Sequence, residues 1–434
     1  MRDGRWADVA HTDARGALTA YDRLLVVAAH PDDECLGAGL LLADAHDLGL
    51  EVTVLVLTDG EGSHPDSPTV TADEMRRRRG TEVDRAMAVL VPGARVLHAG
   101  LPDGGLTERH AEVVEAVRGH LSARTLVLAP WVADGHPDHD ATGRAAAEAV
   151  EPGDGTVALA HYLVWLWHWS GPEDLPWERV VAVDASLEGI RRSALAVAEH
   201  RSQVAPLSPE PGDERLLTEG VLAPSRRGFT TLLLGRGVDP PEPAAGAGGR
   251  VADFDAMFDD GDDPWSSGSF YERRKRDLSL AVLRRARYER VLDVGCSTGS
   301  LTRALAERAG EVVAVDGSGP ALEVARRDAP GNVSWVQGVA PTVLGSVEGP
   351  FDLVVLSEVL YFLTPFEVWR TLGSVLARLA PRAEVVLVDW RHATERIPLD
   401  GPAVHELVRG VCARWGSVAH VEPDVLLDTY EVTA

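Results

Sequence analysis

The sequence predicts an α/β protein with two Rossmann-like domains, and three observations lead to that prediction. In both halves, apolar segments of strand length alternate with helical segments, as in parallel sheets covered by helices. In both halves a polar or glycine-rich turn follows one such strand, at residues 30–34 and 295–299. Between the halves, residues 237–249 are rich in Pro, Ala and Gly and offer little to bury, which is typical of a linker.

Length and composition set the broad class of the protein. The 434 residues suit two domains, and we expect these at residues 1–236 and 253–434, joined by a linker at residues 237–252. The formal net charge of −25 argues against a nucleic-acid backbone or an anionic membrane as partner. The three cysteines are too scattered for a disulfide framework, and we expect neither a signal peptide nor a membrane-spanning run. We therefore expect a cytoplasmic protein, and its oligomeric state is left open.

The first domain is organised around residues 24–34, which read Leu-Leu-Val-Val-Ala-Ala-His-Pro-Asp-Asp-Glu. The apolar part predicts a strand buried on both faces, and the polar part follows at its carboxyl end. Ligands bind at that end of the strands in open α/β sheets. Further elements are expected downstream, as strands at 51–57, 95–99 and 125–129 and as helices at 35–48, 73–90 and 108–122.

A second polar cluster, at residues 131–140, follows the strand expected at 125–129. Because the strands are parallel, both clusters should reach one edge of the sheet. Two histidines and an aspartate form a workable set of zinc ligands that leaves a position for water. A neighbouring carboxylate that is not a ligand, that of Asp32, could act as a base. His30 and Asp33 are expected ligands of zinc or another divalent metal, together with a histidine of the second cluster.

The two clusters carry the motifs His-Pro-Asp-Asp-Glu at 30–34 and His-Pro-Asp-His at 136–139. Together they resemble those of the PIG-L (LmbE-like) N-acetylglucosamine deacetylases, over roughly residues 20–235. The resemblance implies hydrolysis of an N-acetyl group on a small-molecule amino sugar or glycoconjugate. It implies that His30, Asp33 and His139 hold the metal, that Asp32 accepts and returns a proton and that His136 stabilises the oxyanion. It also places Arg79 and Asp103 near the substrate, although a solvated helix face is an equally good interpretation of Arg79.

Residues 161–169 contain three tryptophans at every second position, Trp165, Trp167 and Trp169. The segment is predicted to be a strand, in which these indoles share one face. They could stack on a sugar or line a lipid-like tail. We favour a role in the core or in a domain interface, because such a stripe is more often buried.

The second domain begins with a nucleotide-type turn. Residues 290–302 predict a buried strand, a glycine-rich turn and a helix from about residue 300. Gly295 and Gly299 let the backbone approach a ligand closely. The next strand, at 311–315, ends at Asp316, and an acid there suits a ribose diol. These features fit either a dinucleotide or S-adenosylmethionine.

Asp293 favours S-adenosylmethionine, because it completes the pattern Asp-x-Gly-x-x-x-Gly. Residues 253–434 resemble class I methyltransferases, most closely the nodulation N-methyltransferase type with its Asp-Pro-Trp at 263–265 and Ser-Glu-Val-Leu-Tyr at 357–361. Gly338 and Val339 stand where many methyltransferases carry an acid, so no adenine contact is assigned. The resemblance implies that the cofactor is held by Asp293, Gly295, Cys296, Gly299, Asp316 and Ser357. The acceptor side would be lined by Glu358 and Tyr361, with Tyr271 and His405 as further candidates.

The fusion of the two domains suggests consecutive reactions. Deacetylation of a sugar exposes a primary amine, and an amine is a methyl acceptor. We hypothesise a bifunctional enzyme that deacetylates an N-acetylated amino sugar and then methylates the amine. Three alternatives remain: a deacetylase and O-methyltransferase acting on separate positions of a natural product, a methyltransferase with a non-catalytic partner domain, and a binding or scaffolding protein.

Overall fold

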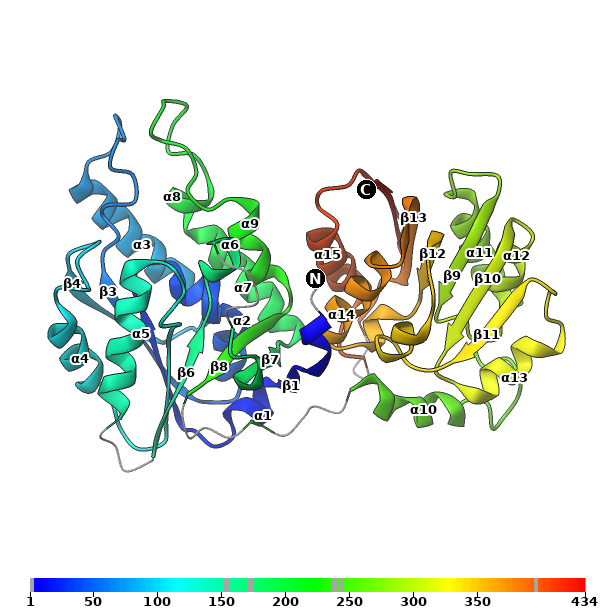
Figure 1. Ribbon diagram of the computed structural model, residues 1–434, viewed down its shortest axis with the longest axis horizontal. Coiled ribbons are helices and arrows are strands. Elements are labelled where there is room, and N and C mark those ends of the chain that lie inside the picture. Colours follow the sequence, from blue (N-terminus) through cyan, green and yellow to red (C-terminus); the bar gives the residue numbers. More distant parts are fainter. Residues whose placement is uncertain are drawn as a thin grey trace. The chain divides into compact units, whose positions relative to one another are not determined.

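The computed structural model describes residues 4–151, 156–169, 175–235, 240–241, 246–393 and 397–433. The chain divides into two compact units, one of Asp3–Ala244 and one of Ala245–Ala434 with Met1–Arg2. Figure 1 shows the first in blue to green and the second in green to red. Much of the expected linker, at residues 237–239 and 242–245, lies outside the described residues.

Among the described residues, the first unit has a sheet in the order β1-β7-β8-β6-β5-β2-β3-β4. Strand β2 lies between β3 and β5 and is parallel to both, whereas β8 is antiparallel to β6 and β7. The strands are β1 (Ala10–Asp13), β2 (Arg23–Ala28), β3 (Glu51–Thr58), β4 (Arg95–Leu101), β5 (Thr125–Pro130), β6 (Val157–Tyr162), β7 (Val180–Asp184) and β8 (Phe229–Leu234).

Helices cover both faces of this sheet because β2 is apolar on both sides (Figure 1). Leu24, Val26 and Ala28 pack into one core with α2, α3 and α7, while Leu25 and Val27 pack into another with α4 and α5. The helices are α1 (Ala14–Leu18), α2 (Asp33–Asp47), α3 (Ala72–Leu90), α4 (His110–Arg118), α5 (Pro137–Val150), α6 (Leu166–Trp169), α7 (Leu187–Glu199), α8 (Arg201–Val204) and α9 (Glu219–Leu222), with 3-10 turns η1 (Gly4–Asp8), η3 (Trp177–Arg179) and η4 (Ala223–Arg226).

The second unit has a sheet in the order β11-β10-β9-β12-β13-β15-β14, as far as the chain is described. Strands β9 to β13 run parallel to one another, and β15 pairs antiparallel with both β13 and β14. The strands are β9 (Tyr288–Val294), β10 (Ala309–Asp316), β11 (Val333–Gln337), β12 (Phe351–Ser357), β13 (Leu379–Trp390), β14 (Ser417–Val421) and β15 (Val425–Thr433).

The helices of the second unit include a short pair that the sequence interpretation missed. η5 (Ala247–Arg250) and the start of α10 (Val251–Ala256) fall within residues 237–252, which we expected to form the linker. The other helices are α11 (Phe270–Ala281), α12 (Ser300–Ala306), α13 (Gly319–Arg327), α14 (Pro365–Leu376) and α15 (Gly401–Val411), with η6 (Thr342–Ser346) and η7 (Leu360–Phe362).

The strand predicted at residues 161–169 is wrong. Strand β6 ends at Tyr162, and α6 begins at Leu166. The carboxylate of Asp134 explains the change, because it accepts hydrogen bonds from the main-chain N–H groups of Val164, Trp165 and Leu166 at 2.9–3.1 Å. Three successive N–H groups directed at one carboxylate cannot belong to an extended strand, in which they alternate in direction.

The α/β fold class with two Rossmann-like domains is confirmed. Within the part of the chain that the structure describes, none of the helices combines the length and the apolar content that a membrane crossing needs. The sequence interpretation missed β1, which pairs in parallel with β7 at the edge of the first sheet.

Candidate functional sites

The polar clusters after β2 and β5 meet at the edge of the first sheet. His30 follows β2, Asp33 begins α2, and His136 and His139 lie at the start of α5. His30, His136 and His139 each offer a ring nitrogen within 4.8 Å of the others. Asp33 Oδ1 lies 3.1 Å from His139 Nε2, and Asp33 Oδ2 lies 3.6 Å from His30 Nδ1. The structure therefore brings the three expected ligands together.

Further carboxylates bind the outer nitrogens of both ligand histidines. Asp134 Oδ2 lies 2.7 Å from His139 Nδ1. Asp103 Oδ1 and Asp138 Oδ2 lie 3.2 and 3.3 Å from His30 Nε2. A carboxylate accepts, so these outer nitrogens carry protons. The inner nitrogens, His139 Nε2 and His30 Nδ1, face Asp33 and are the ones that a metal would use.

This donor set fits a divalent metal such as zinc. Two imidazole nitrogens and a carboxylate, oriented by outer carboxylates, are the ligands that catalytic zinc sites use. His139 Nε2 is buried, and its neighbour at 3.1 Å is Asp33 Oδ1, so a cation between these two atoms would be bound by both. Burial alone would lower the pKa of His139, but Asp33 and Asp134 raise it to about 9. The site thus favours a positive charge at the inner face of His139.

Asp32, the expected base, lies beside the ligands in a strained turn. Its φ of 151° is a backbone conformation that residues with a side chain rarely adopt. Burial raises the pKa of its carboxyl to about 6, against the charge of Arg79. Arg79 is itself 3% exposed. It donates to the main-chain oxygens of Pro31 and Gly60 and lies 3.1 Å from Asp32 Oδ2. Arg79 therefore supports the turn that carries Asp32 from its buried side.

His136 and Asp103 take different positions relative to the ligands. Burial and the neighbouring His30 and His139 lower the pKa of His136 to about 4. Its Nδ1 accepts from the main-chain N–H of Asp138 at 3.3 Å, so its Nε2 carries the proton. Asp103 accepts from the main-chain N–H of Gly62 at 2.9 Å and lies against His30, where it orients a ligand.

Two buried residues of this site, Asp134 and His200, escaped the sequence interpretation as functional groups. Asp134 stands two residues before His136, and an acid so close to the second motif was the signal available. Glu34 Oε2 accepts from the main-chain N–H of Asp32 at 3.0 Å, and Glu34 Oε1 lies 3.2 Å from His200 Nε2. Glu34 thus fixes the main chain of Asp32, the expected base, and His200 in turn contacts Glu34.

The three tryptophans of residues 165–169 lie in three different environments. Trp165 is half-buried and stacks on His136, with ring centroids 6.3 Å apart and an interplanar angle of 27°. Trp169 meets Trp165 edge to face at 5.7 Å and is 63% exposed. Trp167 instead stacks on Trp6 at 6.0 Å. The core interpretation of the stripe therefore fails for Trp169, which forms an exposed aromatic surface beside His136.

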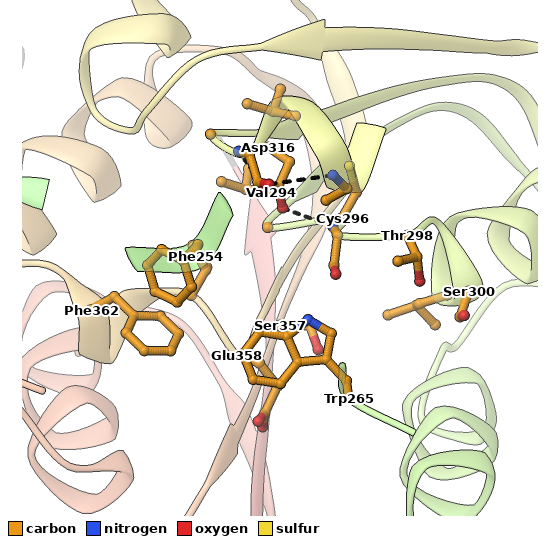
Figure 2. A pocket seen from close by; sticks show the side chains of 18 of the residues that line it. Phe254, Trp265, Val294, Cys296, Thr298, Ser300, Asp316, Ser357, Glu358 and Phe362 are labelled. Carbon is orange, nitrogen blue, oxygen red and sulfur yellow. Dashed lines mark hydrogen bonds between the residues drawn. The ribbon is translucent and has the colours of Figure 1, made fainter. Parts of the chain in front are cut away.

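The second unit contains a cavity of about 290 Å³ above the carboxyl ends of β9, β10 and β12 (Figure 2). Asp316 accepts from the main-chain N–H groups of Ser297 and Ser318 at 2.7 and 2.8 Å. Gly338 and Val339, to which no adenine contact was assigned, also line the cavity. Of the expected cofactor residues, the lining includes Gly295, Cys296, Asp316 and Ser357.

Asp293 and Gly299 shape the turn without lining this cavity. Asp293 is 1% exposed and accepts from Thr302 Oγ1 at 2.7 Å, so it ties β9 to α12. Gly299 has a φ of 78°, and a Cβ there would lie 2.6 Å from the Trp335 ring. The glycine is required by this close approach and by the left-handed backbone.

Part of the cavity wall comes from the end of the expected linker and the first residues of the expected second domain. Arg250, Val251 and Phe254, from η5 and α10, line it together with Trp265. Phe254 meets Phe362 edge to face at 4.7 Å, and Figure 2 shows this pair on one side of the cavity. The sequence interpretation missed Arg250, Val251 and Phe254 as lining residues because their segment follows directly on the Pro/Ala/Gly-rich stretch.

On the acceptor side, Glu358 and Tyr361 line the cavity and bind each other, with Tyr361 Oη donating to Glu358 Oε2 at 2.8 Å. His405, a further candidate, does not line the cavity. It is 3% exposed and lies between Asp389 and Asp428, so the prediction that it faces the acceptor is not supported by its position.

Comparisons with known proteins match the two units separately. The family PIG-L: GlcNAc-PI de-N-acetylase matches residues 25–150, and the family Methyltransferase domain matches residues 291–382. Nodulation protein S of Rhizobium tropici is 31% identical over 173 residues, covering 39% of this chain and 65% of that protein. Diacetylchitobiose deacetylase of Thermococcus kodakarensis is 33% identical over 135 residues, covering 30% of this chain and 49% of that protein.

The chain thus spans less than two thirds of the length of each of these relatives. Among solved structures, N-methyltransferase NodS from Bradyrhizobium japonicum WM9, in complex with S-adenosyl-L-homocysteine, is 24% identical. That match covers 39% of this chain and 92% of that chain, with a TM-score of 0.35. From the family matches, the chain joins a domain of the PIG-L de-N-acetylase family to a domain of the methyltransferase family.

Proposed function

We propose that the chain is a bifunctional enzyme that removes the acetyl group from an N-acetylated amino sugar or glycoconjugate and then methylates the amine it has exposed. The observation that carries the first activity is the pair of ligand histidines, whose inner nitrogens converge on Asp33 while carboxylates bind their outer nitrogens. The names of two relatives, diacetylchitobiose deacetylase and 1D-myo-inositol 2-acetamido-2-deoxy-alpha-D-glucopyranoside deacetylase, support an N-acetylated sugar as substrate.

In the first site, zinc held by His30, Asp33 and His139 would polarise the acetyl carbonyl and supply water with a pKa of about 7. Asp32 accepts a proton from the attacking water and returns it to the departing amine nitrogen. The strained backbone of Asp32 and its contacts with Arg79 and Glu34 keep the carboxylate at a fixed position for both transfers.

His136 stabilises the charge that develops on the carbonyl oxygen. Its Nδ1 is occupied as an acceptor from the main chain of Asp138, so the proton of the neutral ring is on Nε2 and can be donated. The lowered pKa keeps the ring neutral at physiological pH. A donor directed at a developing oxyanion is commonly worth about 100-fold or more in rate.

The exposed surface of Trp169 and Trp165 supports a sugar as the substrate of this site. Trp165 stacks on His136, and Trp169 continues the aromatic surface outwards. The apolar face of a pyranose ring packs well on an indole, which offers a large rigid surface at a low cost in side-chain entropy. The surface would hold a sugar residue next to the one that carries the acetyl group.

In the second site, S-adenosylmethionine would occupy the cavity above β9, β10 and β12. Asp316 suits the ribose hydroxyls, and the turn at Gly295 allows the backbone to approach the ligand. Methyl transfer depends largely on holding the donor carbon and the acceptor atom in line. Glu358 and Tyr361 line the same cavity and are proposed to face the acceptor.

The experiment measures bound metal, S-adenosylhomocysteine binding and deacetylation of diacetylchitobiose on the full chain, beside His139→Ala and Asp316→Ala variants. We expect the wild type to hold about one metal per chain. Both the metal and the deacetylation should be lost only in His139→Ala. Nucleoside binding should be lost only in Asp316→Ala. A wild type that holds no metal, even after incubation with zinc, would refute the proposed deacetylase activity. It would favour a methyltransferase with a non-catalytic partner domain. If the second site is an O-methyltransferase, incubation with methyl-labelled S-adenosylmethionine would instead place the labelled methyl group on a sugar oxygen.

A further inference from the structure

We propose that Glu358 is the residue that selects an amine as methyl acceptor, by binding its ammonium group through Oε1 and then accepting its proton. This inference rests on the proposed methyltransferase function and deepens it. It makes a cationic amine, rather than a hydroxyl, the group that the second site recognises.

Geometry first places Glu358 at the acceptor side of the cavity. Glu358 directly follows β12, and its carboxylate lies across the cavity from Asp316, as Figure 2 shows. Its main-chain N–H donates to the oxygen of Val388 at 2.8 Å, which fixes its backbone. Its φ of 55° lies in the left-handed region that residues other than glycine rarely adopt. Strained residues of this kind concentrate at functional sites, because the surrounding structure must hold them there.

One oxygen of Glu358 is held and the other is without a partner. Oε2 accepts from Tyr361 Oη at 2.8 Å and lies 3.4 Å from Lys275 Nζ. Oε1 is buried and has no hydrogen-bond partner among the described residues. A buried carboxylate oxygen without a partner costs free energy, so a ligand that donates to it binds favourably. Oε1 is therefore the carboxylate oxygen left to accept from a ligand in the cavity that Glu358 lines.

The charge around Glu358 favours a cationic ligand over a neutral one. Lys275 is shared between two carboxylates, with its Nζ 2.9 Å from Glu272 Oε1 and 3.4 Å from Glu358 Oε2. One cation between two carboxylates leaves one negative charge uncompensated. The other cations of the lining, Arg250 and Arg276, donate to the main-chain oxygens of Phe362 and Ser267. An ammonium group would balance the charge of Glu358, whereas a hydroxyl would not.

The reaction balances with groups that the site and the cofactor supply. A bound ammonium transfers one proton to Glu358 Oε1, which leaves a nitrogen lone pair and a neutral carboxyl. That lone pair forms the C–N bond as the bond from methyl carbon to sulfur breaks, and the sulfonium becomes a neutral thioether. Glu358 then loses its proton to solvent when the methylated, cationic product leaves. Burial and the nearby Glu272 raise the pKa of Glu358, which helps it to accept the proton.

The test compares two disaccharides that differ only in the acceptor atom. The amine probe is fully deacetylated chitobiose, and the hydroxyl probe is cellobiose, which carries hydroxyl groups in place of the amines. The full chain is incubated with methyl-labelled S-adenosylmethionine and each sugar. We expect label on nitrogen of the amine probe and no transfer to cellobiose. Equal transfer to cellobiose, or label on an oxygen of the amine probe, would overturn the inference and leave the methyltransferase function standing.

Variants then assign the selectivity to Glu358. Glu358→Gln keeps the shape and removes the charge, and we expect it to lower kcat/KM for the amine probe at least 100-fold. Its binding of S-adenosylhomocysteine should change less than 3-fold, which shows that the cavity is intact. Glu431→Gln, at an exposed ion pair with Arg284, is the control and should behave as the wild type.

If Glu358→Gln transfers the methyl group nearly as well as the wild type, Glu358 does not act on the acceptor. A wild type that binds S-adenosylhomocysteine but methylates neither sugar would refute the proposed methylation of a sugar amine, and this inference with it. A wild type that does not bind S-adenosylhomocysteine would refute the methyltransferase function itself. The three failures therefore give different results.

Discussion

Asp134 and His139 form a fully buried pair, in which Asp134 Oδ2 lies 2.7 Å from His139 Nδ1. The same carboxylate accepts the main-chain N–H groups of Val164, Trp165 and Leu166. One side chain therefore fixes the ring of an expected metal ligand and the start of the helix that carries the exposed tryptophan. The metal site and the aromatic surface beside it are positioned by a common group.

Replacing Asp134 by Asn should weaken metal binding by about 10- to 100-fold, because carboxylates that orient ligand histidines contribute on that scale. The amide keeps one acceptor oxygen for the N–H groups of α6 but removes the charge beside His139. Competition with a chromogenic zinc chelator measures the affinity. The matched control is Asp140→Asn, because Asp140 lies in the same polar cluster at residues 131–140, is half-buried and accepts from the main-chain N–H of Gly135 at 3.2 Å.

Unchanged zinc affinity in Asp134→Asn would contradict the role of Asp134 as an orienting group. Binding of S-adenosylhomocysteine should stay at the wild-type level in both variants, because neither residue belongs to the second unit. A loss in both activities together would instead indicate a general folding defect.

Replacing Trp169 by Ala should raise KM for a disaccharide substrate several-fold and leave kcat and metal content nearly unchanged. The reason is that Trp169 is 63% exposed and contacts no expected ligand, so its loss removes stacking surface rather than chemistry. Trp169→Phe should restore part of the affinity. Steady-state deacetylation of diacetylchitobiose and of N-acetylglucosamine measures the effect, and an equal rise in KM for both sugars would argue against a second sugar subsite.

Raising the pH should destabilise the second unit through His405. Burial alone would lower the pKa of this ring, but the carboxylates of Asp389 and Asp428, 3.4 and 2.9 Å from its nitrogens, raise it to about 8, above the ordinary value of 6.5. A group with a raised pKa in the folded state stabilises the fold fully below 6.5 and loses that contribution as the pH rises through 8. The difference between the two pKa values corresponds to about 2 kcal/mol.

Thermal unfolding of the full chain at pH 6 and pH 8.5 measures this dependence, in the transition that S-adenosylhomocysteine shifts upwards. We expect the wild-type midpoint to fall more between these pH values than that of His405→Gln, which cannot titrate. Parallel pH dependence in the two proteins would show that His405 is uncharged in the fold at pH 6.

Replacing Gly295 by Ala should lower the affinity for S-adenosylhomocysteine at least 10-fold. A Cβ there would lie 2.7 Å from Val359 Cβ, and the φ of 83° costs a residue with a side chain about 1–2 kcal/mol. Isothermal titration measures the affinity. Gly331→Ala, where an added Cβ meets nothing within 4 Å, should bind as the wild type. Retained affinity in Gly295→Ala would show that the turn can relax away from Val359.

Much of the expected site could be predicted from local patterns, because the groups lie next to strand ends. His30 and Asp33 follow one strand, and His136 and His139 follow another in the same parallel sheet, so their meeting follows from the topology. The same logic placed Asp316 at the cavity of the second unit. It failed for Asp293, whose carboxylate turns into the protein to bind Thr302.

By itself, the sequence determined the two Rossmann-like units, the sheet edges at which ligands are expected and the residues proposed to hold a metal. These depend on hydrophobic pattern and on the order of strands and turns, which are local properties of the chain. Only the tertiary structure decided that Asp134 ends β6 and starts α6, that α10 walls the cavity and that Glu358 Oε1 is left without a partner. Such features arise from contacts between residues that are distant in the sequence, and burial and hydrogen bonding set their strength only once the chain has folded.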